Sequence, residues 1–128
     1  MPTAISNDIK ISVETSYQND KVNNAEGHHM FAYRITIENK GEYTIKLLRR
    51  HWDIIDSLDG FSEVEGDGVV GQQPVLEPGE QYTYVSGCAL QGEFGKMFGY
   101  YTMQRQMDGK EFEVLIPEFI MIAPFKFN

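Results

Sequence analysis

The chain has 128 residues and a formal net charge of −8 at pH 7, from 19 acidic and 11 basic side chains. A chain of this length buries a core without disulfides or a structural metal ion, so we expect a single domain over residues 1–128. Its negative charge repels phosphate backbones, and we therefore expect no duplex nucleic acid as a partner.

The cysteine content and the apolar runs indicate the compartment. Cys88 is the single cysteine, and one thiol forms no internal disulfide and fits a reducing environment. The N-terminal residues lack the basic region and apolar run of a signal peptide. All apolar runs fall far short of the ~20 residues that a membrane helix needs. We therefore expect a cytoplasmic protein without a membrane partner.

Regular alternation of apolar and polar residues marks the first two strands. Residues 9–17 and 30–38 both alternate, which is typical of half-buried strands. The polar residues 18–29 between them are expected to form a loop. The sequence Asn-Lys-Gly at 39–41 tolerates positive φ and predicts a turn, so we expect a hairpin with the strand that follows.

That strand is expected over residues 43–55 and changes phase partway. Leu47 has the parity of the apolar residues before it, whereas Leu48 has the parity of Trp52 after it. A β-bulge near Leu47 and Leu48 reconciles the two patterns. We expect Trp52 to fill the core and a further short strand over residues 61–66.

Three glycines follow in the spacing GxGxxG: Gly66, Gly68 and Gly71. This spacing binds a dinucleotide pyrophosphate when a strand precedes it and a helix follows it. Pro74 and Pro78 exclude the helix, since proline removes an intrahelical hydrogen bond and clashes with the preceding turn. The glycines are therefore expected to lie between two strands and not in a Rossmann unit.

Two roles remain open for this glycine loop. We favour a structural role, in which glycine supplies positive φ at no steric cost. The alternative is a nest of backbone N–H groups that holds a phosphate of a nucleotide or dinucleoside polyphosphate. Arg50 and His51 are then the further ligand-binding candidates. The three acids Glu63, Glu65 and Asp67 disfavour an anion at this place.

The second half of the chain contains four further segments with a strand pattern, namely residues 75–76, 81–87, 97–106 and 111–116. Asp108 and Gly109 predict a hairpin between the last two, with the type I′ turn that needs positive φ at both positions. We expect Pro117 to end the pairing, and residues 119–122 to add a separate edge strand.

The pattern as a whole predicts an all-β fold. About seven or eight short antiparallel strands with frequent turn signals, and no helical period, are typical of a sandwich or barrel. Eight Phe, seven Tyr and one Trp suit the core between two packed sheets. We therefore predict an immunoglobulin-like or fibronectin type III-like β-sandwich.

Acidic side chains and two adjacent histidines are the candidate metal ligands. Residues 51–94 contain nine acids and no Lys or Arg. Within them, Glu63, Glu65 and Asp67 share one strand face, which suits either solvent or a hard cation such as Mg²⁺. We favour solvent. His28 and His29 are adjacent in a polar loop and point oppositely on an extended segment, so a shared zinc ion is disfavoured. We assign no metal ligand and no cofactor.

No catalytic arrangement is visible in the sequence. Cys88 lacks a helix N-terminus or another activating group, so we interpret it as a small buried residue and not as a nucleophile. No triad, paired-carboxylate motif or phosphate-binding loop of the Walker type is present. The sequence therefore predicts a protein that is not an enzyme.

One long collinear pattern carries a resemblance. It comprises Arg50-His51-Trp52, the segment GDGVVGQQPVLEPGEQYTYVSG, and then Gly95, Met97, Gly99, Tyr101 and Met103. The chain resembles the ApaG family in this pattern over nearly its whole length. The resemblance implies a fibronectin type III-like sandwich and implies no activity.

What the resemblance implies about function is an interaction role. Bacterial ApaG members are linked with cobalt resistance and magnesium efflux and often lie near a dinucleoside polyphosphate hydrolase. In eukaryotes the domain is attached to F-box and polymerase delta-interacting proteins. We therefore expect a protein-interaction or regulatory module tied to divalent cation homeostasis, with an unidentified protein partner. A small-ligand binder is the alternative. An edge strand near the C-terminus also predicts a homodimer.

Overall fold

The computed structural model describes residues 1–18 and 28–124, and within them the chain forms strands and no helix. The nine strands are β1 (Thr3–Ser6), β2 (Ile9–Gln18), β3 (His29–Asn39), β4 (Ile45–Asp56), β5 (Gly60–Asp67), β6 (Val75–Leu76), β7 (Gln81–Leu90), β8 (Phe94–Arg105) and β9 (Glu111–Ile122). The predicted all-β class is confirmed. In this part of the chain no helix is long and apolar enough to cross a bilayer.

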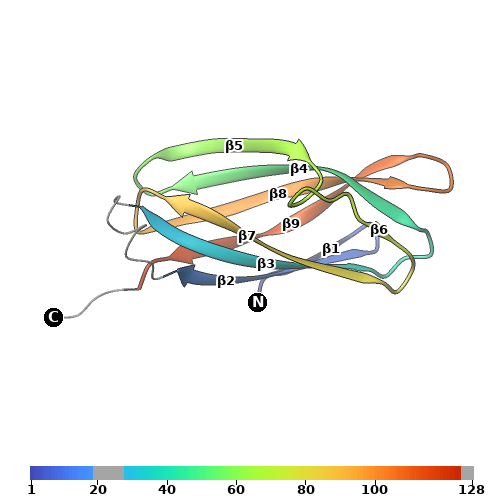
Figure 1. Cartoon of the computed structure of the whole chain (residues 1–128), viewed down its shortest axis with the longest axis horizontal. Coiled ribbons are helices and arrows are strands. Elements are labelled where there is room, and N and C mark those ends of the chain that lie inside the picture. The colour runs from blue at the N-terminus through green and yellow to red at the C-terminus, as the bar shows by residue number, and fades with distance from the viewer. Residues whose placement is uncertain (19–27, 125–128) are drawn as a thin grey trace.

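The strands form two antiparallel sheets that pack as a sandwich (Figure 1). One sheet has the order β1-β2-β3-β7, and the other has the order β5-β4-β8-β9 with β6 paired to β4. The predicted sandwich is therefore confirmed, with one strand more than expected. The additional strand is β1, which reaches β2 through Asn7 and Asp8 with φ values of 50° and 63°. Asn and Asp tolerate this left-handed conformation, which a two-residue hairpin turn requires.

The predicted hairpin at Asn39-Lys40-Gly41 is wrong. β3 pairs with β2 and β7, whereas β4 belongs to the other sheet, so the segment crosses between the sheets. Asn39 is buried and holds the crossing. Its Nδ2 donates to the carbonyl oxygens of Tyr43 (2.8 Å) and Leu76 (3.0 Å), and its Oδ1 accepts from the N–H of Gly41 (3.0 Å). These bonds take the place of the strand pairing that a hairpin would supply.

The last hairpin is confirmed, but its details differ. β8 pairs with β9 as predicted. Gly109 has a φ of 73° and Asp108 has no positive φ, so the turn is not type I′. The N–H of Gly109 instead donates to the carbonyl of Arg105, which makes a wider turn.

Pro117 does not end the pairing, and residues 119–122 are not a separate strand. β9 continues through Pro117 to Ile122. The register of β8 against β9 shifts between Met97 and Gly99, opposite the proline. Such an irregularity leaves residues out of the ladder, and proline needs no ladder partner for an N–H that it lacks.

The predicted bulge in β4 is confirmed. The register of β4 against β8 shifts between Leu47 and Arg49. Beyond this shift, Trp52 faces the core at 3 % exposure, and Arg49, His51 and Asp53 lie on the opposite face of the strand. The bulge thus decides which charged side chains of β4 face outward.

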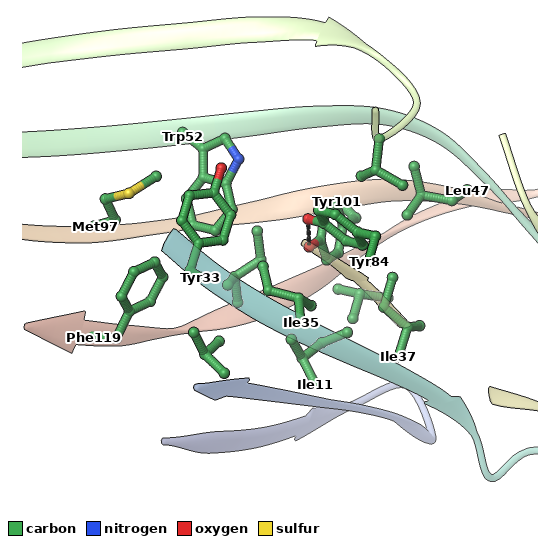
Figure 2. Close-up of a cluster of buried hydrophobic side chains, with 14 of the residues drawn as sticks. Ile11, Tyr33, Ile35, Ile37, Leu47, Trp52, Tyr84, Met97, Tyr101 and Phe119 are labelled. Carbon is green, nitrogen blue, oxygen red and sulfur yellow. Dashed lines mark hydrogen bonds between the residues drawn. The ribbon is translucent and has the colours of Figure 1, made fainter. Parts of the chain in front are cut away.

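The core contains aromatic side chains from both sheets (Figure 2). The ring of Trp52 lies edge-on to Tyr33 and to Phe119, with centroid distances of 5.5 and 5.8 Å. Further along the core the hydroxyls of Tyr84 and Tyr101 share a hydrogen bond of 2.5 Å. Burial raises the pKa of Tyr101 well above its ordinary value, so this pair is neutral.

Candidate functional site

The glycine loop contacts the side chain of Arg50. Gly66 lies in β5 directly opposite Arg50, and a Cβ at Gly66 would come within 2.8 Å of the Arg50 Nη2 atom. Arg50 Nη1 donates to the carbonyl oxygens of Asp67 (2.9 Å) and Gly68 (3.0 Å). The guanidinium group therefore binds the main chain of the loop and needs glycine at position 66 to reach it.

The N–H groups at the centre of the loop donate to carbonyl oxygens of the chain. Gly68 donates to Leu48 (2.8 Å), and Val69 and Gln72 donate to each other at 2.8 and 2.9 Å. Gly68 has a φ of +61°, and a Cβ there would lie 2.2 Å from the Gln72 carbonyl oxygen. These bonds and this close approach support the structural role of the loop, since three N–H groups of a phosphate nest are already bonded.

The tip of the loop is a two-residue turn. Val70 and Gly71 have φ values of 47° and 75°, and Val69 and Gln72 form the bridge that closes the turn. Val69 is fully buried, whereas Val70 is exposed. A β-branched residue is strained at positive φ, so Val70 is an unusual choice for this position.

His51 lies on the opposite face of β4 from Arg50, among acidic side chains. Its Nδ1 lies 2.7 Å from Glu65 Oε1, and its Nε2 lies 3.1 Å from Asp53 Oδ1. Its ring stacks on Tyr100 with a centroid distance of 4.9 Å and an interplanar angle of 15°. The hydrogen bond to Glu65 raises the pKa of His51, burial opposes that rise, and the bond to Asp53 adds to it.

A third acid completes this cluster. Glu63 lies opposite Asp53 in the β4–β5 pair, and Glu65 lies opposite His51. One ligand atom from each of His51, Asp53 and Glu63 lies within 4.8 Å of the others. The alternation of residues along the strand correctly predicted Glu63 and Glu65 on one face but did not reveal His51 and Asp53 beside them. The signal was the spacing of His51 and Asp53, two residues apart on one strand.

A shallow hollow lies beside these groups. Its volume is about 290 Å³, and its lining residues are Arg49, Arg50, His51, Glu65, Gly66, Asp67, Tyr100 and Thr102. The structure therefore brings together Arg50, His51 and Gly66 of the predicted ligand-binding residues. Gly68 and Gly71 are not among the lining residues.

The outer face of the β5-β4-β8-β9 sheet also carries exposed apolar side chains. Five of them gather at one end of the sheet, are between 37 % and 60 % exposed, and are Ile55, Phe61, Phe94, Ile120 and Ile122; we call these five the apolar patch. Sequence reasoning missed the patch because it needs the register of four strands. Only that register places residues from positions 55 to 122 side by side.

Comparison with known proteins gives the family. The ApaG domain model matches residues 19–105. The protein ApaG of Paramagnetospirillum magneticum is 44 % identical over 117 residues, which are 91 % of this chain and 89 % of that protein. The chain belongs to the ApaG family. The protein ApaG of Sinorhizobium fredii is 40 % identical over 124 residues, or 97 % and 95 % of the two chains.

A solved ApaG-like structure shows the same fold. The crystal structure of the putative ApaA protein from Bordetella pertussis superposes with a TM-score of 0.84 at 38 % identity, and the match covers 98 % of both chains. The names of these relatives state no activity.

The side chains considered for catalysis have ordinary structural surroundings in this ApaG chain. Cys88 is buried, and burial, with the charge of Asp56, raises its pKa to about 11. Its thiol is therefore protonated at neutral pH, as the buried interpretation predicted. His29 Nδ1 lies 3.2 Å from the Tyr17 hydroxyl, and His28 Nε2 lies 2.9 Å from Gln91 Nε2. The two histidines thus have separate partners.

Proposed function

We propose that this ApaG-family protein is a non-enzymatic protein-interaction or regulatory module, and that the apolar patch is its docking surface. The observation that carries the proposal is the concentration of exposed apolar side chains on one sheet face. Scattered apolar residues on a surface are ordinary, whereas a contiguous group marks an interaction site.

The strand register makes the patch contiguous. Ile55 lies opposite Phe61 on one side and Lys96 on the other, and Lys96 lies opposite Ile120. Cross-strand partners share a face, so these side chains form a row across all four strands. Phe94 and Ile122 are also partners and extend the row in the next position on that face.

The charge around the patch indicates the chemistry of the partner. Asp53, Glu63 and Glu65 lie on the same face, next to the row. The one lysine in the row, Lys96, is already paired with Glu118 at 2.9 Å. A partner surface with apolar residues and excess Lys or Arg complements this arrangement in both respects. The proposed partner is therefore a protein with a basic, apolar docking segment.

The cellular role in the proposal follows the family resemblance. The link of ApaG members with cobalt resistance and magnesium efflux supports a regulatory role in divalent cation homeostasis, exercised in the cytoplasm through the docked protein. Relatives whose names state no activity fit a protein that is not an enzyme.

A comparison of surface variants tests the proposal. The full chain, Ile120→Ser and Phe61→Ser are used to capture proteins from native lysate, and each captured protein is purified and titrated against the chain. Val85→Ser is the matched control, because Val85 is 54 % exposed on a strand of the other sheet. We expect one basic partner whose binding weakens at least about tenfold in the patch variants and falls with salt. Equal binding by all four proteins contradicts docking at the patch.

The hollow beside Arg50 favours one alternative function. It brings the basic side chains of Arg49, Arg50 and His51 to one opening that Glu65 and Asp67 also line, so a nucleotide or dinucleoside polyphosphate would need Mg²⁺ or the arginines to offset these two acids. Calorimetry with such ligands, with and without Mg²⁺, tests this alternative. Binding that Arg49→Gln weakens supports it, and the absence of heat in both conditions eliminates it.

The homodimer stays a prediction. Part of the outer edge of β9 is already bonded, since the N–H of Leu115 donates to Ser6 Oγ (2.9 Å) and Asn7 Nδ2 donates to the carbonyl of Glu113 (2.8 Å). A dimer through this strand would use main-chain N–H and carbonyl groups of β9 other than those bonded to Ser6 and Asn7. Light scattering over a range of protein concentrations measures its formation.

A further inference from the structure

His51, Asp53 and Glu63 place a nitrogen and two carboxylate groups at one point of the outer sheet face. His51 and Asp53 are two residues apart on β4, and Glu63 faces them from β5. One ligand atom of each lies within 4.8 Å of the other two. This set is not an acidic cluster alone, because it contains an imidazole held in a fixed orientation.

The two carboxylates beside the imidazole ring indicate that a proton or a metal cation lies between His51 and Asp53. A neutral imidazole has one N–H, and Glu65 Oε1, at 2.7 Å from Nδ1, is placed to accept it. Nε2 then directs a lone pair at Asp53 Oδ1, which is 3.1 Å away and also an acceptor. Two acceptors this close repel each other unless a proton or a metal cation lies between them.

Two of the three groups are held in place. The side chains of His51 and Asp53 are 13 % and 18 % exposed. Tyr100 stacks on the imidazole at 4.9 Å and limits its rotation. Glu65 corresponds to the carboxylate that commonly accepts the second N–H of a metal-bound histidine and fixes its tautomer. Glu63 is exposed and can move to complete the set.

We infer that His51 Nε2, Asp53 and Glu63 bind one divalent transition-metal ion of the zinc type, with Glu65 as the partner of His51 Nδ1. Two ligands of a tetrahedral zinc ion lie roughly 3.3 Å apart, given bonds of about 2.0–2.1 Å, and the His51–Asp53 distance is already close to this value. The two carboxylates balance the charge of the ion. The nitrogen ligand favours zinc over magnesium, which prefers oxygen ligands only. This inference does not depend on the proposed docking function.

Calorimetry with Zn²⁺ and with Mg²⁺, in a buffer that does not bind metals, tests the inference on the full chain. Long-range proton–nitrogen NMR spectra of the histidine rings identify the nitrogen that binds. We expect one Zn²⁺ per chain, a change at His51 Nε2, and no saturable binding of Mg²⁺. Asp53→Asn is expected to lower zinc affinity more than about tenfold, and Glu65→Gln between about 10-fold and 100-fold.

Two controls keep the test decisive. Glu63→Gln changes an exposed side chain, so it separates loss of a ligand from loss of the fold, and we expect it also to weaken zinc binding. His28→Gln combined with His29→Gln removes the other two histidines and is expected to leave zinc affinity within about twofold. Loss of zinc binding in this double variant, or a His51 ring signal that is unchanged up to about 1 mM Zn²⁺, would falsify the site. A proton, and not a metal ion, would then lie between His51 Nε2 and Asp53 Oδ1.

Discussion

On the inner face of β4, Arg50 and Asp56 bond to main-chain atoms, whereas on the outer face Arg49 and His51 bond to side chains. Arg50 donates to two carbonyl oxygens of the glycine loop. Asp56 accepts from the N–H groups of residues 58, 91 and 92 at 2.7 to 3.0 Å. By contrast, Arg49 pairs with the carboxylate of Glu111, and His51 lies between two carboxylates.

This difference separates structural charges from candidate functional ones. A main-chain partner is fixed by the fold, so a charge bonded to it stabilises one conformation and is costly to remove. A side-chain partner at the surface can rotate away and be replaced by an ion or by a second protein. We therefore expect the proposed docking and metal binding on the outer face of β4, and a contribution to loop stability from the charges on its inner face.

Arg50→Met is expected to have the largest effect on stability. Methionine has a similar length but donates no hydrogen bond, so the carbonyl oxygens of Asp67 and Gly68 lose their donor. We expect the free energy of unfolding to fall by about 3 kcal/mol, the sum of two hydrogen bonds to a charged group. Urea unfolding followed by Trp52 fluorescence measures the change.

The matched control for Arg50→Met is His51→Gln on the neighbouring residue. Its partners are the side chains of Glu65 and Asp53. We expect it to lower the free energy of unfolding by less than about 1 kcal/mol. An equal loss of unfolding free energy in the two variants would contradict the proposal that charges on the inner face of β4 stabilise the fold more than those on its outer face.

Asp56→Asn tests the second charge of the inner face, and its effect depends on pH. Burial by itself raises the pKa of Asp56, but the N–H groups that it accepts outweigh burial and hold the pKa below its ordinary value. The stabilising contribution is therefore fully present above the unfolded pKa of about 3.9 and is lost as the pH falls through the folded-state pKa.

We expect Asp56→Asn to lower the free energy of unfolding by about 2 kcal/mol at neutral pH, because the amide offers one acceptor oxygen in place of two charged ones. The gap between wild type and variant is expected to narrow below about pH 3.9. Urea unfolding at a series of pH values measures it. A gap that stays constant from neutral to acidic pH would show that Asp56 acts through its shape and not its charge.

Local pattern predicted the strands well, because a buried sheet face requires alternation. The bulge near Leu47 is one example, since only an irregularity explains its change of parity. The prediction was wrong where residues typical of a hairpin turn have a different structural role. Asn39 is a residue typical of a hairpin turn, but its side chain donates hydrogen bonds that hold the segment crossing from one sheet to the other. Such a choice depends on residues far away in the chain, here Leu76, and local sequence does not contain it.

The candidate site was predicted only in part for the same reason. Alternation along one strand identified Glu63 and Glu65 as neighbours on a face. Their proximity to His51 and Asp53 depends on the register of β4 against β5, which the short turn between Asp56 and Gly60 fixes. The glycine loop was correctly excluded from a Rossmann unit by its prolines, because the steric rule for proline in a helix is local.

Val70→Asn is expected to raise stability. Val70 adopts a φ of 47° at the tip of the loop that Arg50 holds, and its side chain is exposed, so little burial is lost on substitution. Asn tolerates this conformation, and Asn-Gly is the preferred pair for such a turn. We expect a gain of about 1 kcal/mol in the free energy of unfolding. Val70→Ala serves as the control and should gain less. A loss of stability in Val70→Asn would indicate that Val70 makes a contact that outweighs its strain.

Arg49→Gln, on the outer face of β4, is expected to have the smallest effect on stability. Arg49 Nη2 lies 2.8 Å from Glu111 Oε1, and both side chains are about half exposed. An exposed ion pair contributes little, because water and salt screen it, so we expect less than about 0.5 kcal/mol. Glu111→Gln should match it, and the double variant should show little coupling. A coupling above about 1 kcal/mol would place this pair with the structural charges and leave His51 as the outer-face residue with exchangeable partners.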